Sequence, residues 1–347
     1  MTKESFFVRQ QGWSLLFGGV MLAATISVMI SPLVGWGLPK NVSSYGPAVD
    51  LLFHVILFVT GFFFILTETL LVYFMYAFAG RSNPPTHPRP VEKAESPPGT
   101  FFRKVTKPLT GVIPDEHRLE MVWTLVPGVI LFVLAVVQIQ TWLQIKDRNW
   151  MPKPDELPLQ MEVSARQFEW RVRYPSPKRM QSWDSDHKLA DDFKPRRYLD
   201  PKTKIWIDNA GVQEDDLHLV NEVHVWKGVR VLVHLTTRDV IHSFYLPNLR
   251  VKQDALPGKV IPVWFEVPDK EDFWNTKFNE DTRKWEDGYD PKKGTWESYE
   301  QTWALACAEL CGWGHYKMLG RLYVHENKED FMKWLEHAEK EQRRSKP

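Results

Sequence analysis

Cysteine is almost absent from this 347-residue chain, which contains only Cys307 and Cys311. No C-x-x-C-H motif occurs, so the sequence encodes no covalently attached c-type haem. An excess of one charge is also lacking: 44 basic and 43 acidic side chains give a net charge of +1, and nothing indicates a nucleic-acid partner. Tryptophan is instead abundant, with 16 residues. This usage is typical of membrane interfaces and aromatic-lined surfaces.

The apolar residues concentrate in three runs within the first 145 residues, at 13–34, 51–79 and 120–145. The shortest run has 22 residues and would form a helix of about 33 Å, enough to cross a bilayer. Pro127 interrupts the third run, but a proline kink is tolerated inside a membrane. The sequence therefore predicts a membrane anchor of two or three helices.

Basic residues set the expected orientation of this anchor. The loop 80–119 carries seven of them, which places it on the cytoplasmic side and everything after Ile145 outside. Lys3 and Arg9 precede the first run, as in a signal peptide. That run is long for a signal, and no small-x-small cleavage site follows it. We favour a retained helix over a cleaved signal.

Two ionisable residues, His54 and Glu68, lie 14 positions apart in the second run and share one helix face. They either lie near the helix ends and reach the membrane surface or mark a face that packs on a partner membrane subunit. We favour the second interpretation.

Short runs with period-two character follow residue 145 and predict an all-β sandwich or Greek-key barrel. Two polar stretches, 175–216 and 269–301, are interpreted as insertions, and the second holds ten acidic and six basic residues. Asn327 is a plausible N-cap for a C-terminal amphipathic helix with Phe331, Trp334 and Leu335 on one face. The expected divisions are an extra hydrophobic segment, a helical hairpin, a β domain and a C-terminal helix, at 1–40, 41–145, 146–326 and 327–347.

The segment from Cys307 to Met318 has the pattern C-x3-C-x3-H-x2-M and contains Cys311 and His315. Two thiols, an imidazole and a thioether in twelve residues form a soft donor set, which selects copper over hard cations. A disulfide or a structural zinc site would use some of the same residues. Zinc sites more often show C-x2-C spacing and need no methionine, so we favour copper.

A second imidazole is available at His242, which follows a strand-like run. A single blue-copper site would use one cysteine. Two thiolates can instead bridge two coppers, with Met318 and the main-chain carbonyl of Glu309 as weak axial groups. The remaining strand histidines have no ligand partner in the sequence and are interpreted as structural: His218, His224, His234 and His325.

Three segments resemble subunit II of the haem-copper cytochrome c oxidases. The loop similar to its CuA-binding loop reads CAELCGWGHYKM, and the segment similar to its first-histidine region reads DVIHSFYLPNLRVKQDALPG. The segment HRLEMVWTLVPGVIL resembles its second transmembrane helix, with Glu120, Trp123, Thr124 and Pro127 in the family pattern. The resemblance extends from about residue 51 to 335, apart from the two insertions.

The resemblance implies a cupredoxin-like Greek-key sandwich that holds a dinuclear CuA centre. The implied copper ligands are His242, Cys307, Glu309 through its carbonyl, Cys311, His315 and Met318. The Glu309 carboxylate would also face a magnesium ion shared with subunit I. Glu120 would stand near the entrance of a proton pathway, and Asp239 would belong to an acidic docking surface for cytochrome c.

The function implied is that of the electron-accepting subunit of a terminal oxidase. It would take single electrons from cytochrome c and pass them to haem in subunit I, where oxygen reduction is coupled to proton translocation. The expected partners are subunit I, other oxidase subunits and membrane lipid, with the copper domain on the periplasmic side of the inner membrane. The main alternative is the CuA subunit of a membrane nitric oxide reductase. A quinol oxidase subunit would lack the cysteines, the CuA domain of nitrous oxide reductase is normally soluble, and a copper carrier would need no Glu120-type helix.

One position departs from the family pattern. The family usually has a tryptophan after glutamine in the first aromatic strand, where electrons arrive, and this chain has Phe168 there. Phe168 and Trp170 are candidate entry points, and Trp313 or an aromatic residue of the insertions could also take this role. The acidic insertion 269–301 is a candidate docking surface for a basic donor, and the alternative is that it forms a solvated loop.

Overall fold

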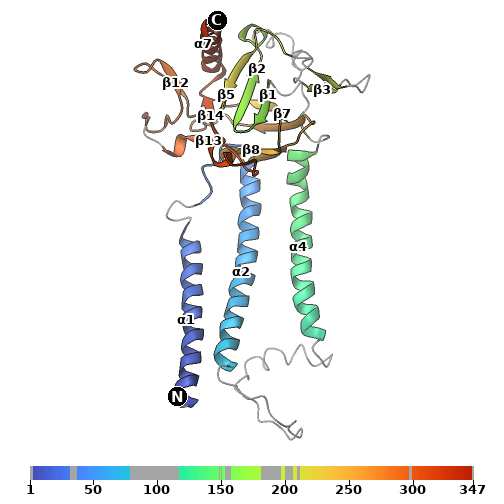
Figure 1. The fold of residues 1–347 in the computed structure, drawn as a ribbon, viewed down its shortest axis with the longest axis vertical. Coiled ribbons are helices and arrows are strands. Elements are labelled where there is room, and N and C mark those ends of the chain that lie inside the picture. Colours follow the sequence, from blue (N-terminus) through green and yellow to red (C-terminus); the bar gives the residue numbers. More distant parts are fainter. Residues whose placement is uncertain are drawn as a thin grey trace. The chain divides into compact units, whose positions relative to one another are not determined.

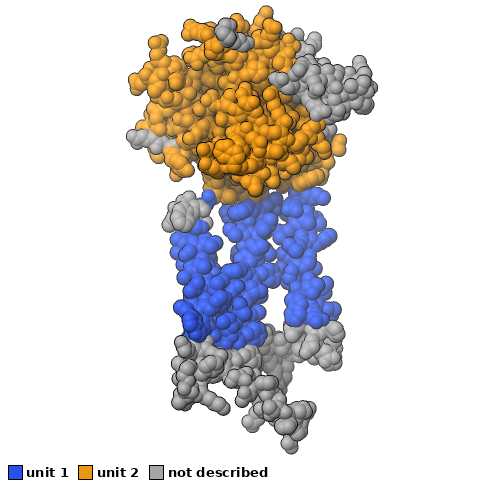
Figure 2. All heavy atoms as spheres, in the orientation of Figure 1, with its two compact units in different colours: residues 1–37, 52–140 blue, residues 38–51, 141–347 orange. Residues whose placement is uncertain are grey.

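The computed structural model describes residues 3–31, 37–78, 117–147, 149, 151–152, 158–180, 197–199, 206–208, 212–296 and 299–345 (Figure 1). The chain forms two compact units. One comprises residues 1–37 and 52–140, and the other comprises residues 38–51 and 141–347 (Figure 2).

Long apolar helices make up the first unit: α1 (Lys3–Ile30), the greater part of α2 (Gly46–Phe78) and of α4 (His117–Lys146). Each contains a stretch long and apolar enough to cross a membrane. Side chains such as Phe58 and Phe132 are 77% and 69% exposed, so lipid or partner helices must cover them. The predicted helical anchor is confirmed. The predicted cytoplasmic loop falls largely on residues 79–116, which lie outside the described residues.

Two five-stranded sheets form the second unit, which confirms the predicted all-β domain. The first has the order β10-β7-β1-β2-β5. Its strands are Ile261–Glu266, Arg230–Thr237, Leu159–Arg166, Glu169–Tyr174 and Leu217–Val220. The second has the order β6-β14-β13-β8-β9. Its strands are Glu222–Trp226, Leu319–His325, Trp303–Cys307, His242–Leu246 and Val251–Ala255.

Smaller elements complete the unit. Two hairpins pair β3 (Arg197–Leu199) with β4 (Trp206–Asp208) and β11 (Lys277–Asn279) with β12 (Lys284–Glu286). The 3-10 turns η3, η4 and η5 cover Pro247–Leu249, Tyr299–Gln301 and His315–Lys317. The last element is helix α7 (Lys328–Ser345).

Each large sheet contains one parallel pair, β1 with β7 and β6 with β14. Parallel neighbours cannot be joined by a tight hairpin, so the chain crosses between the sheets, as a Greek-key sandwich requires. The two inner faces share one core of buried side chains. The largest of them are Trp170, Trp303, Tyr174 and Phe244. This core fixes the strand ends, and the chemistry lies at one set of those ends.

Ion pairs secure the insertion 175–216 where it joins the sandwich. Asp216 is fully buried and accepts hydrogen bonds from the guanidinium groups of Arg173, at 2.7 Å, and Arg179. Arg173 also pairs with Glu162 at 2.8 Å. Most of the insertion itself lies outside the described residues.

Asn275 anchors the second insertion to β14. Its side-chain amide donates to the carbonyl oxygens of Gln301 and Leu322, at 2.8 and 3.1 Å, and its Oδ1 accepts from the Val324 amide at 2.8 Å. The insertion 269–301 is therefore built into the domain over its described part.

The C-terminal helix begins as predicted. The Asn327 Oδ1 accepts a hydrogen bond from the Asp330 amide at 2.9 Å, which caps the first turn. Phe331, Trp334 and Leu335 are buried against the sandwich.

Candidate metal centre

Strand pairing brings the sequence-predicted ligands together. Cys307 ends β13 and pairs with Phe244 of β8, the strand that His242 begins. The loop from Cys307 to β14 carries the other candidates, and Met318 directly precedes β14. Because β8, β13 and β14 are neighbours in one sheet, candidate ligands distant in sequence meet at one end of these strands.

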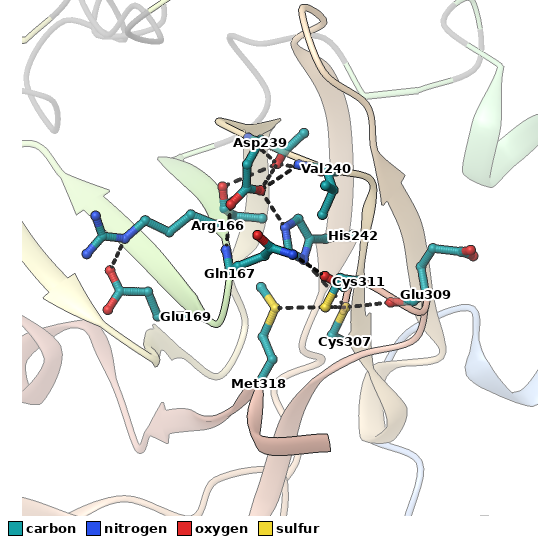
Figure 3. Close-up of polar contacts among 12 residues, drawn as sticks. Arg166, Gln167, Glu169, Asp239, Val240, His242, Cys307, Glu309, Cys311 and Met318 are labelled. Atoms are coloured by element: carbon teal, nitrogen blue, oxygen red, sulfur yellow. Dashed lines mark hydrogen bonds and ion pairs between the residues drawn. The ribbon is translucent and has the colours of Figure 1, made fainter. Parts of the chain in front are cut away.

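One half of the donor set surrounds Cys307 (Figure 3). Its Sγ lies 3.8 Å from His242 Nδ1, 3.2 Å from the main-chain oxygen of Glu309 and 3.8 Å from Cys311 Sγ. The three atoms His242 N, Cys307 Sγ and Cys311 Sγ form a buried group within 4.8 Å of one another.

The other half surrounds Cys311. Its Sγ lies 3.6 Å from His315 Nδ1 and 3.8 Å from Met318 Sδ. Met318 is fully buried and Cys311 nearly so. All six copper ligands named from the sequence therefore converge on one place, with one histidine beside each thiol.

The two thiols are free. Their separation of 3.8 Å is far from the bond length of about 2.05 Å in a disulfide. Two sulfurs bound at about 2.3 Å to one tetrahedral metal ion would lie about 3.8 Å apart. The spacing of Cys307 and Cys311 thus suits shared metal ligation.

The surroundings of the two thiols favour loss of one proton, from Cys307. Burial raises the pKa of the Cys307 thiol, but contacts with His242 and with the amide groups around it outweigh burial and lower that pKa to about 6. Burial and the adjacent Cys307 raise the pKa of Cys311. A bound cation would favour the second thiolate, because metal ligation requires deprotonated sulfur.

Asp239 orients His242. The Nε2–H of His242 donates to Asp239 Oδ1 at 2.8 Å, which leaves Nδ1 directed at Cys307. The Asp239 carboxylate also accepts from the backbone amides of Gln167 and Val240, each at 2.7 Å. This role of Asp239 was not predicted from the sequence, although the D-x-x-H spacing carries the signal. Such carboxylate partners fix the tautomer and orientation of metal-binding histidines.

Phe168 packs on the loop that carries the thiols. Gln167 Nε2 donates to the Cys311 carbonyl at 2.6 Å. A Cβ atom at Gly314 would lie 2.5 Å from the Phe168 ring, so only glycine permits this approach. Gly312 has a φ of +128°, a conformation that other residues rarely adopt.

The other aromatic candidates lie in different environments. Trp313 is 81% exposed, and its ring centroid lies 5.2 Å from that of Phe168. Trp170 is fully buried, 6.2 Å from the His242 ring. Trp170 therefore packs behind a ligand, whereas Trp313 is accessible to a partner. The four histidines interpreted as structural, His218, His224, His234 and His325, all lie in strands outside the metal centre.

Comparison with known proteins gives matches to one family. Residues 164–279 match the model for the periplasmic domain of cytochrome c oxidase subunit II, and residues 100–141 match the model for its transmembrane domain. Cytochrome c oxidase subunit 2 of Thermostichus vulcanus is 25% identical over 331 residues, which cover 90% of this chain and 83% of that protein.

Two further relatives are shorter matches. A probable cytochrome c oxidase subunit 2 of Rickettsia conorii is 28% identical over 237 residues, which cover 67% of this chain and 57% of that protein. The crystal structure of the periplasmic domain of subunit II (CoxB) of Bradyrhizobium japonicum is 24% identical, with a TM-score of 0.31, and covers 55% of this chain and 97% of that chain.

The apolar helices, the β-sandwich and the soft donors at the ends of its strands define a cupredoxin-like β protein with a helical membrane anchor and a candidate metal centre. Within that class, the matches over both the anchor and the β domain point to one family. They support identification of the chain as a cytochrome c oxidase subunit II.

Proposed function

We propose that this chain is the copper-bearing, electron-accepting subunit of a terminal oxidase. It takes single electrons from cytochrome c and delivers them to haem in subunit I, where oxygen is reduced. The observation that carries the proposal is the convergence of two thiols, two imidazoles and a thioether within one buried loop region of a subunit II relative. The same relatives favour an oxidase over a nitric oxide reductase.

Two copper ions fit the donor set better than one zinc ion. Cys307, Cys311, His242, His315, Met318 and the Glu309 carbonyl would together hold them. The arrangement of the donor atoms supports two ions, because His315 contacts Cys311 but is not part of the compact group formed by His242 and the two sulfurs. A single tetrahedral ion would need all its donors in one compact group.

The bound pair would supply one-electron redox chemistry, and the chain's own residues would keep its geometry constant. Gln167 holds the Cys311 carbonyl, Asp239 holds His242, and Phe168 packs on the loop at Gly314. A loop fixed from three sides changes little when its charge changes. Small reorganisation favours rapid transfer between partners.

The membrane helices support assembly with other subunits. Their long apolar faces are exposed in the chain alone, which fits burial in lipid and against subunit I. By analogy with the family, the Glu309 carboxylate would face a magnesium ion shared with subunit I, and Glu120 would stand near a proton pathway. The sandwich would lie on the periplasmic side of the inner membrane.

Metal analysis tests the proposal. The full chain, purified in detergent without chelator, should contain two coppers per chain and show the purple colour of a thiolate-bridged pair. Cys307→Ser should remove both coppers, while Trp296→Ala, in the insertion, should keep them. One zinc per chain, or a Cys307–Cys311 disulfide in freshly isolated protein, would contradict the assignment.

Protease protection tests the orientation. Protease added to cells whose outer barrier has been opened should cut the domain after residue 146 and spare the loop 80–119. Cleavage in the loop with the domain intact would reverse the topology.

A further inference from the structure

Exposed apolar side chains of the β domain gather around the metal centre. Among the described residues from 158 to 345, nine large apolar side chains are exposed. Six of these lie within two residues of a proposed copper ligand: Val240, Ile241, Leu310, Trp313, Tyr316 and Leu319. Large apolar groups concentrated at one functional loop mark an interaction surface rather than scattered surface residues.

Four of the six belong to a face made of three turns: residues 167–168, 239–241 and 312–316. Val240 and Ile241 are 40% and 44% exposed, and Trp313 and Tyr316 are 81% and 68% exposed. We call this the three-turn face. Figure 3 shows the Glu309 side chain directed away from turns 167–168 and 239–241 of this face.

Hydrogen bonds join the three turns into one unit. The Gln167 amide donates to the Asp239 carboxylate at 2.7 Å, and the Gln167 side chain donates to the Cys311 carbonyl at 2.6 Å. Phe168 then packs between the loop backbone and the Trp313 ring. A partner that contacts Trp313 therefore contacts a rigid continuation of the copper loop.

The charges around the three-turn face do not make it acidic. Asp239 accepts three hydrogen bonds from His242 and two backbone amides, so its carboxylate oxygens already have donors within the domain. Glu169 is shared by Arg166 and Arg171, at 2.5 and 2.6 Å. Over residues 166–171, 238–241 and 312–317, two acidic side chains stand against four basic ones: Glu169 and Asp239 against Arg166, Arg171, Arg238 and Lys317.

The acidic insertion is anchored at the other end of β14. Asn275 bonds to Val324, and Thr276 pairs with His325. His325 is seven residues from Met318, which corresponds to about 23 Å along a strand at about 3.3 Å per residue. Three of the insertion's carboxylates, those of Asp269, Asp272 and Asp290, are also paired with lysines. This arrangement does not favour the insertion as the donor's docking site.

We propose that the three-turn face docks the electron donor, that Trp313 is the contact through which electrons enter, and that the donor's contact surface is apolar and not basic. The inference rests on the proposed function. The donor loses one electron and the copper pair gains it, with no bond or proton transferred. An apolar contact around Trp313 would exclude water, and buried tryptophans commonly dominate the binding energy of such contacts.

Stopped-flow reduction of the copper-loaded full chain tests the inference. Two c-type cytochromes serve as probes, one strongly basic and one acidic. Trp313→Ala should lower the second-order rate with the acidic probe at least tenfold, whereas Trp296→Ala, which truncates a less exposed tryptophan in the insertion, should not. Raising the ionic strength from about 0.01 to 0.15 M shortens the screening length from about 30 to 8 Å and should change the wild-type rate less than about threefold. Binding of the same probe to the copper-free chain should weaken in Trp313→Ala and not in Trp296→Ala.

The outcomes separate the two proposals. Equal rates and equal binding for Trp313→Ala and wild type, with copper intact, would overturn the docking inference. A rate that falls steeply with salt and is highest for the basic probe would overturn its charge assignment. A wild-type chain that binds no copper, or whose copper neither cytochrome reduces, would overturn the proposed function itself.

Discussion

Two pairs of histidines belong to the same β-sandwich, and only one of these two pairs lies beside the thiols. His242 and His315 each place Nδ1 within 3.8 Å of a thiol sulfur. His224 and His325 instead lie 3.1 Å from each other, nitrogen to nitrogen, among aromatic rings. The His224 ring stacks between Tyr323, at a centroid distance of 4.1 Å, and Trp334, at 3.7 Å.

The surroundings give the two pairs opposite acid–base behaviour. Burial lowers the pKa of His242, but Cys307 and Asp239 outweigh it, so the pKa of His242 is raised. Burial without comparable acceptors lowers the pKa of both His224 and His325 well below the usual value. The neighbouring atoms, rather than the residue type, decide whether a buried histidine serves as a ligand or as part of an aromatic core.

Removing a thiol should have the largest effect. It should act on the copper held beside His242 and His315 and leave His224 and His325 unchanged. Cys311→Ser should abolish the purple absorbance and the bound copper completely, because each proposed copper loses a bridging ligand. Copper per chain and the visible spectrum measure the change. The far-ultraviolet circular dichroism should match wild type, and retention of a purple two-copper centre would remove Cys311 from the ligand set.

Truncating a histidine should separate ligand from core. His224→Ala should destabilise the chain by about 3 kcal/mol, since it removes a ring stacked between two aromatic side chains, yet leave the copper spectrum unchanged. Urea unfolding of the copper-free chain, followed by tryptophan fluorescence, measures this.

His315→Ala is the matched variant and should behave in the opposite way. It should lose the wild-type copper spectrum while the copper-free stability changes by less than about 1 kcal/mol, because this side chain is only half-buried. If both variants lost copper and stability to the same degree, the two pairs would not be independent.

Acid should destabilise the folded chain through His224 and His325. The folded pKa values of His224 and His325 lie below the unfolded value of about 6.5, so the unfolded chain binds more protons as pH falls below that value. Stability is therefore complete above about pH 6.5 and declines below it, by at most roughly 2.7 kcal/mol per pH unit for two protons. Urea unfolding of the copper-free chain between pH 7.5 and pH 5, values chosen to bracket about 6.5, measures the slope.

Other groups contribute to the same profile. Burial also lowers the pKa of His234 to about 4, which adds in the same direction, whereas burial raises the pKa of Glu222, 3.5 Å from His224, and opposes the loss at lower pH. A double variant with His224→Gln and His325→Gln should therefore have a shallower slope. An identical slope would assign the acid sensitivity to other groups.

Disrupting Asp239 should have the smallest effect. Asp239→Asn keeps the size of the side chain but weakens acceptance from His242 Nε2–H, so copper affinity should fall about 10–100-fold and the spectrum should shift. Competition with a chelator measures the affinity. Glu169→Gln, which alters a nearby surface carboxylate, is the control, and an unchanged affinity in Asp239→Asn would limit the aspartate to a structural role.

Local patterns predicted much of the molecule. The three apolar runs became helices, Asn327 capped the last helix, and all six proposed ligands met at one strand edge. Periodicity, capping and ligand spacing act over a few residues, so they can be read directly from neighbours in the chain. Four histidines were interpreted as structural because no soft donor is near them in sequence, and they also lie outside the metal centre.

Contacts between distant residues were not predictable in this way. Asp239 was expected on a docking surface, and only the fold shows that its carboxylate also bonds to His242 and to Gln167, 72 residues away. Trp170 and Trp313 were equal candidates for receiving electrons until burial separated them. The acidic insertion was a candidate docking surface, and only the fold shows that Asn275 fixes it at the end of β14 away from Met318.

The sequence by itself determined the membrane helices, the all-β domain and the set of soft donors, because each depends on residue type at short spacing. Only the tertiary structure decided which histidine nitrogen faces the thiols, which tryptophan is exposed beside them and which carboxylates accept hydrogen bonds within the domain. Those properties depend on the pairing of β8 with β13 and on the packing of turn 167–168 against loop 312–316. Neighbours brought together by folding set the solvation and the hydrogen bonds of a side chain, and these in turn set its chemistry.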